Sequence, residues 1–336
     1  HSVWVSDHVV VPAQFASVYP YGGGFTVAGT ENYFDPLITL ACIAGCTSQA
    51  RLGTSVLVLP YRPPVLAAKM IATLDALSAG RVILGIGVGW LEEEFRALQA
   101  PPFAERGDVS DEQLRVFKAL WTQPEPSFEG KYYRFDPVRC APKPIQQPHP
   151  PIAIAGVNRG SDGLALAGSR GYIPMSSNFL PTEALIDHWQ TYERAARQAG
   201  RIPRRADWRI ARDIYVAETS EQARRDVRES GIGRAFAQYM LPLVQSGGRG
   251  LGVFKPHPDA LSDDAITIDY LMEKVWIVGS PAECAAKLRR LYEDVGGFGT
   301  VLMIAHDWLP DEEKWFRSTE LFVKQVLPSL ADLVPA

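Results

Sequence analysis

Cysteine is scarce in this chain, and the spacing of the few cysteines excludes the usual cysteine-based sites. Only four occur among 336 residues, and none of them forms a Cys-x-x-Cys pair. Cys42 and Cys46 stand four residues apart within an apolar segment that indicates a helix. This pattern predicts neither a disulfide framework nor a cysteine-based metal centre. We therefore expect a reduced, cytoplasmic protein whose functional site holds no metal.

The chain also lacks an excess of charge of either sign and any long apolar run. Its 34 basic and 38 acidic residues give a formal net charge of -4, and no basic run occurs. Without a positive patch, a nucleic acid partner is not expected. No apolar stretch reaches the roughly 18 residues that a membrane-spanning helix requires, so a membrane partner is not expected either.

Two common catalytic fingerprints are missing. There is no Gly-x-Ser-x-Gly nucleophile elbow, which counts against a serine hydrolase. Residues 80–95, GRVILGIGVGWLEEEF, are rich in glycine but lack the third glycine at the offset of the dinucleotide-binding fingerprint. The apolar run at 82–86 does not alternate, which favours a strand buried on both faces of a parallel sheet. A strand that ends in glycines is where an α/β enzyme places its ligand, and an ordinary strand–turn–helix connection is the alternative.

What the chain does contain is a repeated alternation of strands and helices. Seven strand patterns occur, near residues 3, 52, 82, 152, 172, 210 and 301, with helical patterns between them. The first of these helices is predicted to begin with Asp35 as N-cap and Pro36 at its first position. We predict one α/β domain over residues 1–336, with insertions near 123–151 and 247–275. One helix is expected from about Asp111 to Trp121, and Gly130 between short aromatic runs predicts a hairpin in the first insertion. An eighth strand–helix unit before residue 1 would close a (β/α)8 barrel, and a doubly wound open sheet is the alternative.

Candidate functional residues follow the predicted strands, because the site of a barrel is built from the carboxyl ends of its strands. Two of the six histidines lie at such positions beside an aspartate: His8 follows Asp7, and His306 precedes Asp307. A histidine with an ordinary pKa near ~6.5 suits acid–base chemistry, so Asp7, His8 and His306 are our catalytic candidates. In the alternative interpretation, each histidine simply bonds to a neighbouring carbonyl.

Further polar residues occupy later strand ends. Arg212 and Asp213 lie within a long predicted strand at 208–217. Ser176, Ser177 and Asn178 precede a helix that is predicted to begin near Thr182. Hydroxyl groups and amides before a helix can bind an anion such as a phosphate, and ordinary capping of that helix is the alternative.

Several longer motifs together resemble those of the bacterial luciferase-like flavin-dependent oxidoreductases, a superfamily of (β/α)8 barrels. They include VWVSDHVVVP at 3–12, RLGTSVLVLPYRPP at 51–64, LDALSAGRVILGIGVGWLEEEFRAL at 74–98, PFAERG at 102–107 and AHDW at 305–308. The resemblance covers nearly the whole chain. It implies a TIM barrel whose first strand and helix precede residue 1.

The resemblance also implies roles for individual residues. His8 matches a histidine that lines the flavin, and Ser55-Val56 matches the position of a non-prolyl cis peptide bond that supports the flavin ring. Val88 replaces the arginine that binds the flavin phosphate in luciferase, so Arg106 or Arg159 would take over that role. The other residues implied in cofactor binding are Gly87, Gly89, Trp90, Gly156, Ser176 and Ser177. Trp308 and Asn178 would line the substrate pocket beside His306.

The function implied by the resemblance is that of a flavin-dependent monooxygenase. In our leading hypothesis, the chain is the oxygenase component of a two-component system. It binds reduced FMN (FMNH2) from a separate flavin reductase and uses O2 to oxygenate a mainly apolar organic substrate through a flavin C4a-peroxide. Because Ser6-Asp7-His8 resembles members that use the deazaflavin coenzyme F-420, hydride transfer with F-420 is the alternative. A non-catalytic flavin-binding barrel is a third possibility, and a homodimer is expected.

Overall fold

The computed structural model describes residues 1–13, 17, 32–229, 231–241, 250–306 and 308–335. These residues form two compact units. The described residues of the N-terminal unit lie between 1 and 155, and those of the C-terminal unit lie between 156 and 335. The prediction of one domain over 1–336 remains a prediction.

The N-terminal unit is built on parallel strands. They are β1 (Ser2–Val5), β2 (Arg51–Thr54), β3 (Leu57–Val58), β4 (Val82–Gly87) and β7 (Ile152–Gly156). Val3 lies opposite Leu52, and Leu84 lies opposite Ile152, so β1, β2, β4 and β7 follow one another, with β3 beside the carboxyl half of β4. All residues of β4 except its last are buried, which confirms the prediction of a strand covered on both faces.

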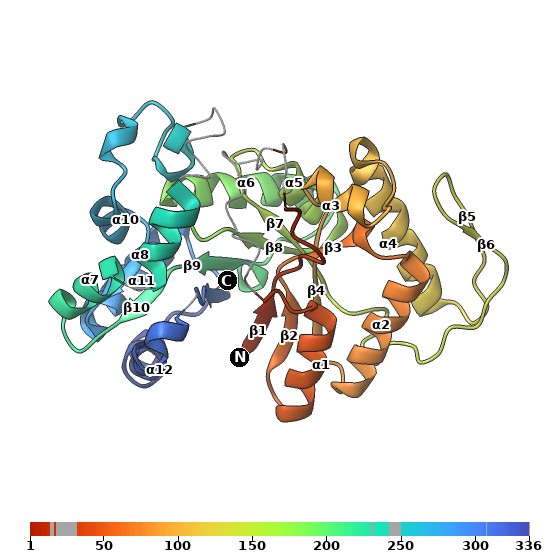
Figure 1. Ribbon diagram of the computed structural model, residues 1–336, viewed down its shortest axis with the longest axis horizontal. Coiled ribbons are helices and arrows are strands. Elements are labelled where there is room, and N and C mark those ends of the chain that lie inside the picture. Colours follow the sequence, from red (N-terminus) through yellow and green to blue (C-terminus); the bar gives the residue numbers. More distant parts are fainter. Residues whose placement is uncertain (14–16, 18–31, 230, 242–249, 307, 336) are drawn as a thin grey trace. The chain divides into compact units, whose positions relative to one another are not determined.

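Helices α1 (Pro36–Cys46) and α2 (Pro64–Leu77) pack along β2 and β4 in this unit (Figure 1). Helix α1 begins as predicted, because the Asp35 side chain accepts hydrogen bonds from two amides of its first turn. Helix α4 (Arg106–Thr122) begins five residues before the expected Asp111, and the short helix α3 (Glu92–Ala97) was not expected. The hairpin of β5 (Phe128–Glu129) and β6 (Arg134–Phe135) is present as predicted and projects away from the sheet (Figure 1).

The C-terminal unit contains two sets of parallel strands. Strands β8 (Ile173–Ser176), β9 (Arg209–Arg212) and β12 (Thr300–Met303) pair in that order with β9 in the middle. Strand β10 (Ile214–Val216) pairs with β11 (Ile277–Gly279). The helices are α5 (Asp162–Arg170), α6 (Thr182–Gln198), α7 (Ser220–Glu229), α8 (Gly231–Ala235), α10 (Ile268–Lys274), α11 (Pro281–Val295) and α12 (Glu312–Leu321).

One strand prediction in this unit was wrong. The expected strand 208–217 is interrupted at Asp213, and its second half leaves β9 to pair with β11, a strand that was not expected. The Asp213 carbonyl accepts the amide of Ile277, 2.9 Å away, which turns the chain toward the new partner. The apolar residues of β10 and β11 then pack with α11 and α12 in a core of buried side chains. That core comprises Ile214, Val216, Ile277, Cys284, Leu288, Leu321, Phe322 and Val326.

Within the described part of the chain, no helix combines the length and the apolar character needed to cross a membrane. The four cysteines are all free thiols, with Cys42 and Cys46 exposed on α1.

Asp35 provides a test of how the N-terminal unit is held together. Burial alone would raise the pKa of Asp35, but hydrogen bonds from Arg62 and the Ile38 and Leu37 amides hold it below its ordinary value. We expect Asp35→Ala to lower the free energy of unfolding by about 1–2 kcal/mol, and Asp35→Asn to cost less because an amide oxygen still caps the helix. Since a lowered pKa stabilises only while the carboxyl is ionised, the difference between wild type and Asp35→Asn should vanish as the pH falls below about 4. Denaturant titrations at pH 7 and pH 3 measure this difference, and an equal difference at both values would contradict it.

Candidate functional site

In the N-terminal unit, His8 is held by a carboxylate that the sequence analysis did not single out. Glu94, on helix α3, is fully buried and lies 86 positions from His8 in the sequence. One of its oxygens accepts from the His8 Nδ1 at 2.8 Å and from the Tyr61 hydroxyl at 2.8 Å. Its other oxygen accepts from the backbone amides of Val9 at 2.7 Å and Val10 at 3.2 Å.

Four donors around Glu94 determine the protonation of its neighbours. A carboxylate has about four acceptor positions, and a proton on either oxygen would compete with a donor already in place. Glu94 is therefore ionised, and the His8 Nδ1 carries a proton. Burial and the Glu94 charge raise the pKa of Tyr61, which keeps its hydroxyl protonated as the donor. The His8 Nε2 is consequently the ring nitrogen that can accept a proton.

Asp7, predicted as a catalytic residue beside His8, is occupied by other contacts. It is buried and accepts two hydrogen bonds from the Arg62 guanidinium, at 2.7 and 2.9 Å. The amide of Val58 donates to it at 2.9 Å, and Arg62 also reaches Asp35 at 2.7 Å. A bidentate pair of this kind fixes geometry and holds the carboxylate ionised. These contacts tie the segment after β1 to β3 and to the start of α1.

The ends of β2 and β4 are packed closely enough to require glycine. The Ser55-Val56 peptide bond is cis, as the resemblance implied. A Cβ on Gly87 would lie 2.5 Å from the Val56 side chain, so only glycine lets Val56 lie directly on the β4 backbone. Gly89 has φ +81°, and a Cβ there would lie 2.7 Å from the Phe95 ring. Ser55 remains exposed above this packed turn.

Two other predicted cofactor residues lie near this turn. The Trp90 ring lies edge-on to His8, with 6.4 Å between the ring centroids, and the Tyr33 ring lies edge-on to His8 at 5.6 Å. Arg106 donates from Nε to the carbonyl of Gly89 at 3.1 Å, and its guanidinium lies 4.1 Å from the centre of the Phe103 ring. Thus His8, Trp90, Gly89 and Arg106 are brought together around one loop.

In the C-terminal unit, His306 and Asn178 meet at a shared carboxylate. The His306 Nε2 bonds to one oxygen of Asp213, and the Asn178 side-chain amide donates to the other at 2.8 Å. Only 3% of the Asp213 side chain is exposed. Asp307, the neighbour noted in the sequence, lies outside the described residues.

The Ser176 hydroxyl belongs to a buried chain of hydrogen bonds. The Trp208 indole donates to it at 3.0 Å, and it lies 3.0 Å from the His188 Nδ1. The His188 Nε2 lies 2.8 Å from the Asn158 carbonyl, which can only accept, so Nε2 carries the proton and Ser176 donates to Nδ1. The alternative that this turn caps helix α6 is wrong, because Pro181 precedes the helix and no side chain caps it. Any role of Ser176 toward an anion is not tested by these contacts.

The remaining predicted residues serve local packing in the described structure. Arg159 donates to the Glu183 carbonyl at 3.0 Å and to the Pro256 carbonyl. Gly156 leaves room for the Leu164 side chain, which a Cβ would approach to 2.5 Å. Trp308 is buried between two stacked aromatic rings, 5.0 Å from Tyr215 and 5.6 Å from Trp315 between ring centres.

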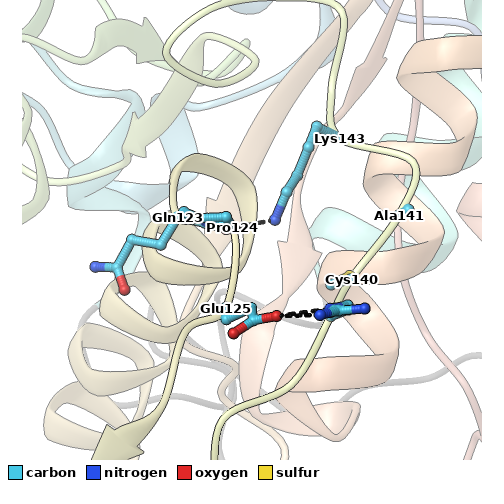
Figure 2. Close-up of a pocket in the computed structure, with 7 residues that line it drawn as sticks. Gln123, Pro124, Glu125, Cys140, Ala141 and Lys143 are labelled. Atoms are coloured by element: carbon cyan, nitrogen blue, oxygen red, sulfur yellow. Dashed lines mark hydrogen bonds and ion pairs between the residues drawn. The ribbon is translucent and has the colours of Figure 1, made fainter.

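A depression of about 570 Å³ in the N-terminal unit does not belong to this site (Figure 2). It lies where helix α4 ends, and the Lys143 ammonium there donates to the Leu120 and Gln123 carbonyls, each at 2.6 Å. Such contacts stabilise a helix C-terminus. In a parallel α/β fold the helix C-termini lie at the amino ends of the strands, away from the functional face. No cluster of three or more metal-ligating side chains occurs within the described residues.

Comparison with known proteins identifies the class. Residues 1–297 match the family model of the luciferase-like monooxygenases, so the chain belongs to that family, as the motifs predicted. Among its relatives is 3,6-diketocamphane 1,6-monooxygenase of Pseudomonas putida, 31% identical over 327 residues that cover 89% of this chain and 85% of that protein.

Solved structures confirm the (β/α)8-barrel fold. The oxygenating constituent of the Pseudomonas putida 3,6-diketocamphane monooxygenase, a type II Baeyer–Villiger monooxygenase in complex with FMN, superposes with a TM-score of 0.85 at 27% identity. That match covers 99% of this chain and 89% of the relative. An F420-dependent secondary alcohol dehydrogenase superposes with a TM-score of 0.66 at 20% identity, covering 98% and 90%, and so shares the fold. The doubly wound alternative is therefore wrong.

Sequence reasoning missed Glu94 and His188. Glu94 is the last of three consecutive glutamates, Glu92-Glu93-Glu94, and residue type alone does not distinguish it from the other two. The available signal was spacing: Glu94 stands three positions after Leu91 and directly before Phe95, and both of these residues are buried. Because residues three apart lie on the same side of a helix, Glu94 lies on the inward face of the short helix. His188 lies in the middle of α6 on a face with Ala184, Leu185 and Thr191, all buried. A polar residue on such a face indicates an internal partner.

His188 predicts a dependence of stability on pH. Its burial lowers its pKa to about 4. Between about pH 6.5 and 4 the unfolded chain binds a proton at this residue and the folded chain does not. The folded state therefore loses stability as the pH is lowered through this window, by a total on the order of 3 kcal/mol. The variant His188→Gln should be less stable at pH 7 but lose less stability on acidification. Chemical denaturation from pH 7 to pH 4 tests this, and the same substitution at the exposed His257 controls for residue type. Parallel curves for wild type and His188→Gln would reject the assignment.

Proposed function

We propose that this protein is the oxygenase component of a two-component monooxygenase that uses reduced FMN and O2 to oxygenate a mainly apolar organic substrate. The observation that carries this proposal is the ordered His8, fixed by the buried Glu94 at the strand ends of a chain whose solved relative binds FMN. Because that relative is a Baeyer–Villiger monooxygenase, a ketone is the first substrate class to test.

The residues present fit a flavin. The Ser55-Val56 turn, supported from beneath by Gly87, offers a firm backbone surface on which a flat ring can rest. Arg106 is the better of the two arginines for the phosphate, because it uses Nε and Nη1 for protein carbonyls and keeps Nη2 for another acceptor. In Arg159, both terminal nitrogens donate hydrogen bonds to backbone carbonyls. His8 and Trp90 would lie beside the ring, as the resemblance implied.

Reduced FMN, when bound, supplies the electrons that activate O2 for transfer of one oxygen atom to the substrate. The contribution of the chain is acid–base chemistry and orientation. Glu94 fixes the His8 ring, so its Nε2 can take a proton from a reacting group and return it. Because Glu94 is saturated with donors, it does not compete for that proton. The aromatic rings of Tyr33 and Trp90, which both lie edge-on to His8, provide apolar surroundings that limit access of water.

The surface of α1 supports a homodimer. Its exposed residues include Ile38, 62% exposed, together with Ala41 and Cys42, and the helix carries no charged residue. An uncharged helix face of this kind is typical of an interface between copies of one chain. A separate flavin reductase would supply the reduced cofactor.

Hydride transfer with coenzyme F-420 remains the second candidate function, supported by the Asp7-His8 pair that follows β1 and by the shared fold of an F420-dependent dehydrogenase. Titrating the purified protein with FMN, anaerobic reduced FMN and F-420 separates the two. We expect binding of reduced FMN at micromolar or lower concentration and at least about tenfold weaker binding of F-420. Tight binding of F-420 alone would replace the proposal with the second candidate, and binding of neither cofactor would reject both.

His8 provides the mutational test. We expect His8→Ala to retain the fold and the affinity for reduced FMN but to lower the rate of oxygenation by about 100-fold or more, because a positioned acid–base group contributes on that scale. Stopped-flow absorbance follows the flavin, and product analysis follows the substrate. The matched control is His149→Ala, since His149 precedes the amino end of β7. Oxygenation at the wild-type rate in His8→Ala would reject the role of His8.

A further inference from the structure

The second histidine, His306, is also held by a buried carboxylate. Asp213 lies immediately after β9, and the Ile277 amide fixes its backbone carbonyl at 2.9 Å. One carboxylate oxygen meets the His306 Nε2, and the other accepts the Asn178 amide at 2.8 Å. The strand interruption at Asp213 therefore places a buried carboxylate behind a histidine at the carboxyl ends of β9 and β12.

The negative charge of Asp213 compensates the positive charge of its buried neighbour in the chain, Arg212. Arg212 is 1% exposed, and its Nη1 donates to the carbonyls of Asn178 at 3.2 Å and Ala211 at 3.1 Å. Its buried Nε has no partner within the described part of the structure. Burial lowers the pKa of Arg212 to about 10, and the negative charge of Asp213 opposes that effect. A neutral Asp213 would leave a buried cation uncompensated, so the carboxylate is ionised.

An ionised Asp213 determines which nitrogen of His306 carries the proton. The carboxylate can only accept, so the neutral ring must place its hydrogen on Nε2 and leave Nδ1 as the proton acceptor. His8 has the opposite arrangement, since its Nδ1 donates to Glu94 and its Nε2 accepts. The two histidines therefore present different nitrogens for chemistry.

We propose that Asp213 is a positioning residue that fixes the His306 ring, with Asn178 orienting the carboxylate, so that the His306 Nδ1 serves as a second proton-carrying group of the enzyme. The role in turnover rests on the proposed monooxygenase function, whereas the ring geometry does not. The proposal also changes the role of Asn178, which was predicted to line the substrate pocket and here acts through Asp213.

The ring geometry is tested by ¹⁵N NMR of histidine-labelled wild-type protein, at a pH at which the His306 ring is neutral. The signal is assigned by its loss in His306→Gln. We expect the tautomer with hydrogen on Nε2, and a ring with hydrogen on Nδ1 would overturn the proposal. This measurement needs no active enzyme and no Asp213 variant, so it stands if the function proposed above fails or if a variant does not fold.

Variants then test Asp213 itself. In Asp213→Asn the His306 ring should lose its single tautomer, and kcat should fall about tenfold or more while KM changes little, because an unpositioned base reacts less often without weakening binding. The matched control is Asp332→Asn, which removes an exposed aspartate paired with Arg289 and should leave both readouts unchanged. A folded Asp213→Asn protein that keeps the wild-type tautomer and kcat would overturn the proposal. If Asp213→Asn does not fold, Asn178→Ala provides the test, because it keeps both Asp213 and the buried Arg212. This variant should broaden the His306 signals and lower kcat, and unchanged signals and kcat would overturn the proposal equally.

Discussion

The candidate site in the N-terminal unit depends on one buried charge. A carboxylate removed from water is costly unless hydrogen bonds replace its hydration, and Glu94 receives four of them. These donors come from two places in the chain: His8, Val9 and Val10 follow β1, and Tyr61 lies in the turn after β3. The same contacts that make the charge tolerable therefore fix the position of His8. Removing any donor would weaken the others, because each stabilises the ionised state that the rest require.

Asp213 is likewise a buried carboxylate stabilised by hydrogen bonds, but it contacts a different nitrogen of its histidine. There the buried anion also compensates a buried arginine, so its charge state is set by Arg212 as well as by its hydrogen bonds. Because His8 bonds through Nδ1 and His306 through Nε2, the ring nitrogen that remains is Nε2 in His8 and Nδ1 in His306. Each carboxylate thereby selects the nitrogen through which its histidine would act in the proposed function.

Features with local causes were predictable from the sequence. The N-cap at Asp35, the buried strand β4 and the hairpin around Gly130 follow from residue types within a few positions of one another. The family motifs also placed the cis peptide bond at Ser55-Val56 correctly. The strand positions near 3, 52, 82, 152, 172, 210 and 301 all proved right, because apolar runs between turns depend little on distant partners.

The parts that failed depend on contacts between distant residues. Glu94 differs from Glu92 and Glu93 only in the direction it faces, which is set by how α3 packs rather than by residue type. The interruption of the 208–217 strand depends on a partner strand about 60 residues later, and the residue types at 208–217 give no sign of that partner. The Ser176 hydroxyl is occupied by Trp208 and His188, whose proximity no local pattern encodes. Sequence patterns thus pointed to His8 and His306 as candidates, but the buried carboxylates that contact them are apparent only in the folded chain.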